Sequence, residues 1–318
     1  MKHAKIIFNI TCFFTLFLTF TGFAVENSLS VQFINAFGQH KKSPVQLKEP
    51  KGISADRNQN VYVSDTGNNR IVKYDATGRL LAFIGGFGWE REQFQQPMGL
   101  FVYNVMDVFV ADYQNDRIVR YDKDLNWIMS FKPDAGWEAQ YQFAFPKAVS
   151  LSLHGDFFII DGEHSRIIKL NSSFVPQTSF GDYDWGKGML SNPESIAISR
   201  QDNVFVSDSD AGVIKVYDYY GSFLYDIGTD FLSEPAGICV DELGNIFIAD
   251  RGLDKIFAFN NQGHLLLQYG SSGEQYGAFQ FVSDVTVSHN MLFTADTNNN
   301  RIQVFKIVEN EGQVEAQQ

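Results

Sequence analysis

The sequence predicts an all-β fold, a six-bladed β-propeller built from four-stranded antiparallel blades. One pattern returns six times along the chain, and every copy but the last holds four short runs of β-branched and aromatic residues separated by Gly, Asn and Asp. No helical periodicity interrupts these runs after the N-terminal segment. Each copy is marked by an aspartate at the end of its second run: Asp65, Asp112, Asp161, Asp208, Asp250 and Asp296.

The first unit shows the pattern most clearly. Its four runs cover residues 52–56, 61–65, 70–75 and 80–85, with turn residues between them. Four such runs predict four antiparallel strands, which form one blade, and we name them a to d from the centre outward. The sixth unit opens at Val282, whereas the other five open at Pro50, Pro97, Pro146, Pro193 and Pro235.

The sixth unit lacks a fourth run, because the repeat stops after residues 301–305. An orphan run at residues 31–38 resembles the fourth runs of units four and five. We therefore expect residues 31–38 to pair with residues 301–307, which completes the last blade and removes an exposed sheet edge. The propeller is predicted to cover residues 30–307, and the polar, acidic segment 308–318 is predicted to be a disordered tail.

Residues 61–75 read Val-Tyr-Val-Ser-Asp-Thr-Gly-Asn-Asn-Arg-Ile-Val-Lys-Tyr-Asp, and this segment resembles the consensus of the NHL repeat. The resemblance extends over nearly all of residues 30–307, with departures at Val213 and Lys255, where arginine is expected, and at Val282, where proline is expected. It implies an NHL-repeat six-bladed β-propeller protein of the exported, bacterial type. Such proteins include binding modules, sensor domains and a few metal-dependent enzymes, so the resemblance implies the fold and leaves the function open.

The N-terminus has the character of a secretory leader. Lys2 and Lys5 precede an uncharged run from Ile6 to Val25, which ends in small residues near Ala24. We expect residues 1–24 to be a cleaved signal peptide and the protein to be periplasmic or secreted. The alternative is an uncleaved leader that anchors the chain in a membrane with the propeller outside the cytoplasm, since the run is long enough to span a bilayer.

Composition bears on partners and on stability. The formal net charge is -12, from 25 Lys and Arg against 37 Asp and Glu, which is the wrong sign for a surface that binds nucleic-acid phosphates. No nucleic-acid partner is expected, and no membrane span if the leader is cleaved. After that cleavage Cys239 is the one remaining cysteine, so the mature chain cannot form an internal disulfide and depends on packing.

The six repeat aspartates could suggest a ring of cation ligands. An aspartate at a strand end also commonly accepts hydrogen bonds from turn amides, and a basic residue follows five positions later in five of the six units. We therefore interpret the aspartates as structural turn residues, each paired with that basic residue where one is present.

Connectivity predicts which residues surround the central channel. The d–a and b–c loops lie on one face of the disk, here called the upper face, and the residue after each unit's opening position borders the channel there. These residues are Lys51, Met98, Lys147, Glu194, Ala236 and Ser283. In the peptidyl-hydroxyglycine lyases that resemble NHL propellers, zinc-binding histidines occupy this position. None of the six is a histidine here, so that zinc chemistry is not expected.

A calcium-dependent lactonase of the gluconolactonase-like type would need Glu, Asn and Asp side chains in the channel as oxygen ligands. Only Glu194 and Asp284 are acids near the start of a first strand, and no set of asparagines accompanies them. A solvated channel rim is therefore the preferred interpretation. No Ser-His-Asp arrangement is indicated either. We predict no metal, no cofactor and no catalytic residue.

Three tryptophans, Trp89, Trp137 and Trp185, recur 48 positions apart at equivalent points of successive d–a loops, and they define a predicted aromatic arc. Exposed rings on the upper rim suit a protein, peptide or glycan ligand. The alternative is that each ring packs between neighbouring blades, as Phe94 and Phe143 of the same loops are expected to do.

The sequence thus predicts an exported, non-catalytic binding or scaffold propeller that engages a protein, peptide or glycan through its upper-face loops. Lys51 and Lys147 are placed to meet acidic groups on a ligand, or else are solvated lysines. The alternative function is a metal-dependent, lactonase-like lyase or hydrolase that acts at the channel mouth. The predicted ligand-binding rim residues are Trp89, Trp137, Trp185, Lys51, Lys147 and Glu194.

Overall fold

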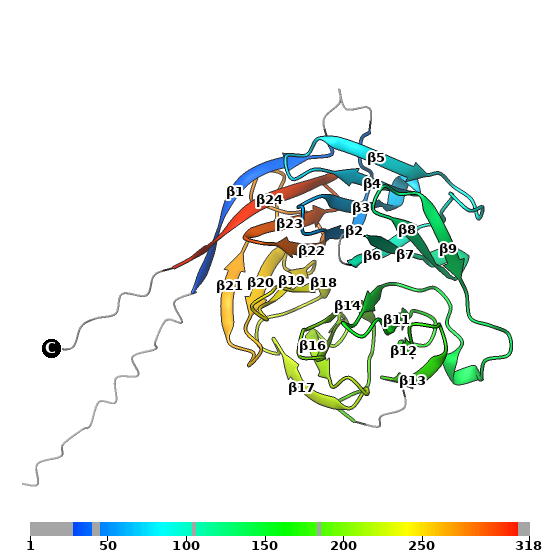
Figure 1. The fold of residues 1–318 in the computed structure, drawn as a ribbon. Coiled ribbons are helices and arrows are strands. Elements are labelled where there is room, and N and C mark those ends of the chain that lie inside the picture. The colour runs from blue at the N-terminus through cyan, green and yellow to red at the C-terminus, as the bar shows by residue number, and fades with distance from the viewer. Residues whose placement is uncertain (1–27, 40–44, 104–105, 183–185, 311–318) are drawn as a thin grey trace, which may run out of the picture.

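The computed structural model describes residues 28–39, 45–103, 106–182 and 186–310. These residues form six antiparallel sheets of four strands each, arranged around a central axis (Figure 1). The predicted all-β, six-bladed propeller is therefore confirmed. Among the described residues no helix is long and apolar enough to cross a membrane. The predicted leader, residues 1–24, lies outside the described ranges.

Each blade follows the predicted a-to-d order, and the strand bounds are as follows. Blade 1 contains β2 (Pro50–Ala55), β3 (Val61–Asp65), β4 (Arg70–Tyr74) and β5 (Leu80–Gly85). Blade 2 contains β6 (Pro97–Tyr103), β7 (Asp107–Asp112), β8 (Arg117–Asp122) and β9 (Trp127–Phe131). Blade 3 contains β10 (Val149–Leu151), β11 (Phe157–Asp161), β12 (Arg166–Leu170) and β13 (Pro176–Phe180).

The second half of the ring repeats this order. Blade 4 contains β14 (Pro193–Ile198), β15 (Val204–Asp208), β16 (Val213–Tyr217) and β17 (Phe223–Ile227). Blade 5 contains β18 (Pro235–Val240), β19 (Ile246–Asp250), β20 (Lys255–Phe259) and β21 (Leu265–Tyr269). Blade 6 contains β22 (Val282–Ser288), β23 (Met291–Asp296), β24 (Arg301–Glu309) and β1 (Leu29–Phe37). Three single-turn 3₁₀ helices lie in loops: η1 (Thr66–Asn68), η2 (Tyr113–Asn115) and η3 (Ala139–Tyr141).

The N-terminal strand closes the ring as predicted. β1 is the outermost strand of blade 6 and pairs antiparallel with β24 from Leu29 opposite Glu309 to Phe37 opposite Ile302. Figure 1 shows the two strands side by side at the left of the disk. β24 continues through Val308 and Glu309, two residues beyond the predicted end of the propeller, because β1 begins early enough to pair with them.

The core lies between the blades. Buried apolar side chains form six clusters, and each cluster joins the facing sides of two neighbouring blades. One example is the cluster between blades 6 and 1, which contains Phe37 of β1, Ile53 and Val63 of blade 1, and Phe293 and Ile302 of blade 6. Each blade therefore buries both faces only when its two neighbours are in place, and the ring stabilises itself by closing.

Each repeat aspartate is buried at the end of strand b and accepts hydrogen bonds from upper-face loops. In blade 2, Asp112 accepts the amide of Gln95 at 2.9 Å and the Nε–H of Arg117 at 2.7 Å. The two Nη groups of Arg117 donate to the carbonyl oxygens of Trp89, Glu90 and Gln93, which lie in the preceding d–a loop. The predicted structural role of the aspartates is confirmed, and the Asp112–Arg117 pair also fixes the d–a loop that precedes blade 2.

The pairing holds in four units rather than the predicted five. Asp–Arg pairs form in blades 1, 2, 3 and 6. In blade 5, within the described chain, Lys255 makes no ion pair with Asp250, which instead accepts the amides of Ser233, Glu234 and Leu253. The physical reason is donor position: arginine pairs through Nε, part-way along its side chain, and lysine has no donor there.

Burial outweighs ion pairing in its effect on the pKa of three repeat aspartates. Burial raises the pKa of Asp65, Asp112 and Asp296, and the paired arginine and the hydrogen bonds from amides and asparagine side chains oppose that rise. Each carboxylate is thus tolerated in the interior because several donors surround it. Removing the carboxylate or one of its donors therefore leaves the remaining buried polar groups without a hydrogen-bond partner.

We predict that deleting β1 destabilises the whole ring. A chain that begins at residue 39 leaves β24 with an unpaired edge and removes Phe37 from the core between blades 6 and 1, so we expect a lower melting temperature and aggregation. Calorimetry should compare it with a chain that begins at Ser28 and keeps β1. Equal melting temperatures for the two chains would contradict closure by β1.

We also predict that repeat aspartates with an arginine partner carry more stability than those without one. Asp112→Ala leaves the buried Arg117 without a counter-charge and should cost about 3 to 5 kcal/mol. Asp208→Ala is the matched control, because Val213 replaces the arginine in blade 4 and, among the described residues, the backbone amides of Ser191 and Asn192 are the partners that lose their acceptor. Its expected cost is about 1 to 3 kcal/mol. Urea unfolding of both variants measures the difference, and equal losses would show that the arginine is unimportant.

Candidate functional site

In five of the six blades the pairing of the first two strands is irregular at the channel residue. In blades 1, 2, 4, 5 and 6 the pairing of strands a and b shifts immediately after the opening residue. Pro50 faces Asp65, for example, but the next pair is Gly52 with Ser64, so Lys51 is left out of the ladder. A bulge of this kind redirects a side chain at the end of a strand.

The six predicted channel residues all line one cavity of about 300 Å³ on the upper face, which we call the channel mouth. Each blade contributes one of them, so the site is assembled only when the ring is complete. Three of the six predicted ligand-binding rim residues therefore lie together at the mouth: Lys51, Lys147 and Glu194. Tyr113, Arg251 and Phe281 also line the mouth, and the sequence analysis did not select them.

A signal for two of the missed residues was present in the repeat. Tyr113 and Arg251 each follow a repeat aspartate and lie at the start of a b–c loop, where the other units have Thr, Gly or Ser. Only these two positions in the set carry a long side chain that can reach the mouth. Phe281 precedes the opening residue of blade 6, and its ring lies 5.5 Å from the guanidinium carbon of Arg251.

A chain of charges crosses three blades at the mouth. Glu194 of blade 4 lies between Lys147 of blade 3 and Arg251 of blade 5, with its Oε1 atom 3.3 Å from Lys147 Nζ and 3.3 Å from Arg251 Nη2. Lys147 Nζ also donates to Asn192 Oδ1 at 2.5 Å, and Arg251 Nε lies 3.4 Å from Glu234 Oε2. Glu194 is therefore engaged by two cations.

Asp284 is a buried carboxyl in the wall of the channel. It lines both the mouth and a second cavity of about 200 Å³ deeper in the channel. Its Oδ2 atom accepts the amide of Ile53 in blade 1 at 2.8 Å, and its Oδ1 atom accepts the amide of Val285 at 2.8 Å. Burial raises the pKa of Asp284 to about 7, although the two amides oppose this shift.

The neighbouring blade makes room for this carboxyl. A Cβ atom at Gly237 would lie 2.1 Å from Asp284 Oδ1 and 2.3 Å from its Cα atom, so no side chain fits there. The other five blades have Gly, Ala or Ser at the position of Asp284. Asp284 is therefore the exception in the inner ring, and it links blade 6 to blade 1.

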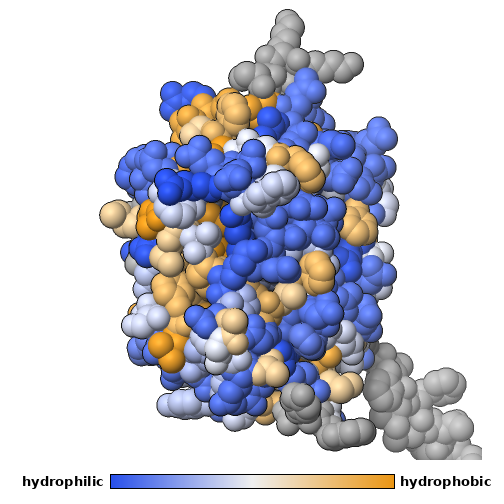
Figure 2. Space-filling model, turned by 90° about the vertical axis from the view of Figure 1, so that its right-hand side faces the viewer, coloured by the Kyte–Doolittle hydropathy of each residue, from blue (hydrophilic) through white to orange (hydrophobic). Residues whose placement is uncertain are grey.

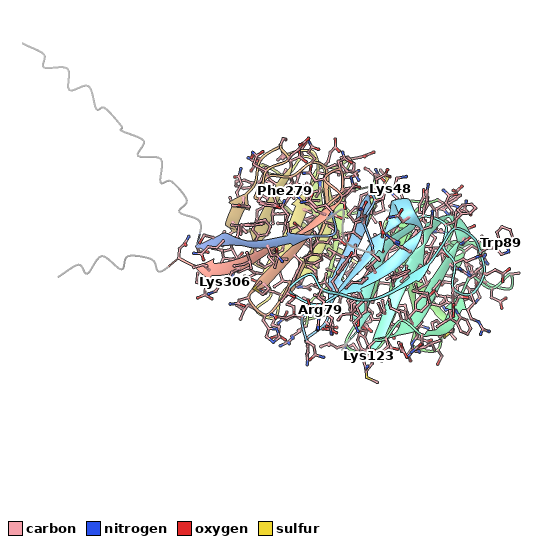
Figure 3. The ribbon with its side chains drawn as sticks, turned by 90° about the horizontal axis from the view of Figure 1, so that it is seen from above. Lys48, Arg79, Trp89, Lys123, Phe279 and Lys306 are labelled. Atoms are coloured by element: carbon pink, nitrogen blue, oxygen red, sulfur yellow. The ribbon has the colours of Figure 1, made fainter. Side chains whose placement is uncertain are left out.

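The predicted aromatic arc is divided in the structure. Trp89 is 72% exposed and its neighbour Phe87 is 67% exposed. Figure 3 shows Trp89 at the outer rim of the disk, and it does not line the mouth. Figure 2 shows the side of the molecule toward which the loop after β5 projects, where hydrophobic surface lies in patches among hydrophilic side chains. Trp89 is therefore an exposed ring on the rim, and it does not pack between blades.

Trp137, in contrast, packs between neighbouring blades, which was the alternative prediction. It is partly buried against the cluster between blades 2 and 3, beside Phe143. Phe94 and Phe143 are both buried, as predicted. Equal spacing in the sequence thus gives unequal environments, and Trp185 lies outside the described residues.

The described residues contain no group of three or more His, Cys, Asp or Glu side chains that could hold a metal ion. Glu194 and Asp284, the two acids weighed as calcium ligands, are bound by cations and by backbone amides respectively. On the upper face, His164 Nδ1 lies 2.9 Å from Oδ2 of the repeat aspartate Asp161. The mouth presents charged and apolar side chains to its cavity.

The described residues form a six-bladed β-propeller with a charged channel mouth. The NHL repeat matches residues 47–74, which form the end of the loop before blade 1 and its first three strands. No curated protein matches the sequence.

Several solved structures share the fold. A catalytically inactive virginiamycin B lyase from Staphylococcus aureus with quinupristin is 16% identical, with a TM-score of 0.58 over 90% of this chain and 90% of that one. A gluconolactonase from Xanthomonas campestris is 16% identical, with a TM-score of 0.62 over 83% and 87%. A protein of unknown function from Bacteroides thetaiotaomicron is 13% identical, with a TM-score of 0.68 over 89% and 77%. At these identities the similarity shows the fold alone.

We predict that Asp284 makes stability fall as pH rises. Its pKa of about 7 lies above the ordinary value of 3.8, so the folded chain retains a proton that the unfolded chain has lost. The free energy of unfolding should drop by roughly 3 kcal/mol from this residue between pH 5 and pH 8. Urea unfolding at several pH values should show a flatter profile for Asp284→Asn than for the wild type, and parallel profiles would contradict the assignment.

Proposed function

We propose that this chain is an exported, non-catalytic binding or scaffold propeller that engages a protein or peptide through its upper face, with a glycan as the second choice of ligand. The observation that carries the proposal is the channel mouth, a cavity of about 300 Å³ to which every blade contributes. It offers cationic and apolar side chains, and both of its acids already have protein partners. Such a mouth favours recognition over metal-assisted chemistry.

The exposed aromatic pair on the rim supports a macromolecular ligand. Phe87 and Trp89 lie in the d–a loop of blade 1, whose carbonyl groups are held by Arg117. A loop fixed in this way presents its rings at little entropic cost, and large rigid rings are common energetic anchors of protein interfaces. A ligand that spans the mouth and this rim must be longer than a small metabolite.

The competing proposal is a lyase or lactonase, the activities that the names of two similar structures state. A metal-dependent form of it would require ligands that converge at the mouth. We expect purified protein to carry neither zinc nor calcium in stoichiometric amounts by metal analysis. A bound metal whose removal by a chelator also lowers the melting temperature would favour the enzyme.

We predict that Trp89 contributes to binding and Trp137 to stability. Trp89→Ala should weaken capture of the native partner from the periplasm or medium by about 1 to 3 kcal/mol and leave the melting temperature nearly unchanged. Trp137→Ala, the matched control, opens a partly buried space and should cost roughly 2 to 4 kcal/mol of stability. Quantitative pull-down and calorimetry separate the two effects. Undiminished capture by Trp89→Ala would remove the rim from the binding surface.

A further inference from the structure

Three cationic side chains reach the channel mouth from alternate blades. Lys51 belongs to blade 1, Lys147 to blade 3 and Arg251 to blade 5, and all three line the same cavity. In a six-bladed ring, alternate blades are evenly spaced about the axis, so the charges approach the cavity from three sides. Cations that converge on a concave, partly desolvated site favour an anion there.

Positive charge exceeds negative charge among the lining residues. The two lining acids are Glu194, which Lys147 and Arg251 share, and Asp284, which is buried and bound by backbone amides. Glu234 contacts Arg251 from outside the lining. Within the described chain, Lys51 has no ion-pair partner, although it is partly buried in the mouth. Its ammonium is therefore the unneutralised charge, in a chain whose formal net charge is -12.

The mouth already shows how it holds a carboxylate. Glu194 places one oxygen 3.3 Å from a cation on each side of it. Between Lys51 and this cluster the wall carries Met98, Tyr113 and Phe281, which suit the methylene groups that precede a carboxylate rather than a fully hydrated inorganic ion.

Building on the proposed function, we propose that the channel mouth binds a carboxylate of the peptide or protein ligand. Lys51 is its main contact, and Lys147 and Arg251 strengthen the positive potential from the other two sides. An acidic side chain and a free C-terminus carry the same group, and both reach the axis of the disk only as a protruding end or loop. The site thus selects acidic peptide segments.

Three synthetic peptides of one length test this with the purified full chain. The first contains glutamates and has blocked ends, the second replaces them with glutamine, and the third is the glutamine peptide with a free C-terminal carboxylate. Titration by calorimetry at pH 6, where Asp284 is largely protonated, should show at least tenfold tighter binding for one of the carboxylate peptides than for the neutral one. Which peptide binds identifies the source of the carboxylate, and binding should weaken when salt is raised from 50 to 300 mM.

Lys51→Met should weaken that binding about tenfold or more, whereas Lys51→Arg should retain most of it. Lys48→Met is the matched control, because Lys48 is exposed on the same face (Figure 3) and makes no contact with the mouth. Equal binding of all three peptides, or equal losses from Lys51→Met and Lys48→Met in chains with wild-type melting temperatures, would overturn the proposal. So would tighter binding of inorganic phosphate than of the glutamate peptide.

The carboxylate proposal and the proposed function fail in different ways. If a native partner is captured but Lys51→Met captures it as well as the wild type does, the carboxylate site is wrong and the binding function stands. If the carboxylate peptides bind through Lys51 but no protein or peptide partner is captured, the site stands and the scaffold function is wrong.

Discussion

The buried aspartate at the end of each strand b is the element around which the upper face is organised. It accepts amides from the loop that enters its blade, and in four blades it also fixes an arginine. That arginine donates in turn to carbonyl oxygens of the same loop, as Arg301 does to Glu274, Gln275 and Ala278. Loop conformation is thus determined by charge-assisted hydrogen bonds inside the disk, which leaves the loop side chains free to vary.

Ring closure and the channel mouth share the same residues. Ser283 Oγ donates to the carbonyl oxygens of Pro50 and Lys51, Thr297 Oγ1 donates to that of Pro50, and Asp284 accepts the amide of Ile53. Blade 6 is therefore joined to blade 1 through the inner strands at the mouth as well as through β1 at the outer edge. A change that loosens this junction also displaces Lys51, so the geometry of the mouth and the stability of the ring are physically coupled.

Three cationic side chains, Lys51, Lys147 and Arg251, line the channel mouth of this acidic chain. Several of its aspartates serve turns, as the local hydrogen bonds of Asp56, Asp122 and Asp241 show. Lys51 stands at a bulge, Lys147 precedes the first strand of blade 3 and Arg251 lies in a b–c loop. Among the described residues only Glu194 pairs with two of these cations. The mouth thus gathers positive charge in a chain of negative net charge, and the proposed binding of a carboxylate rests on this contrast.

The sequence by itself determined the number of blades, their strand order, the closure by the N-terminal strand and the six positions around the channel. These follow from a repeat whose period and turn residues are local properties, and the ring geometry then places equivalent positions at equivalent radii. Phe94 and Phe143 could be assigned to the core for the same reason. The Asp–Arg pairs could also be predicted from the sequence. The missing ion pair between Lys255 and Asp250 could not, because it depends on where the donor lies along the side chain.

Only the tertiary structure decided what each position does. Trp89 and Trp137 have the same place in the repeat, yet one is exposed and the other packs against blades 2 and 3, because the d–a loops differ in course and in neighbouring side chains. Arg251 joins the mouth from a b–c loop, and Asp284 fits because Gly237 of the next blade leaves space for it. These outcomes depend on contacts between blades, and such contacts involve residues that are far apart in the sequence.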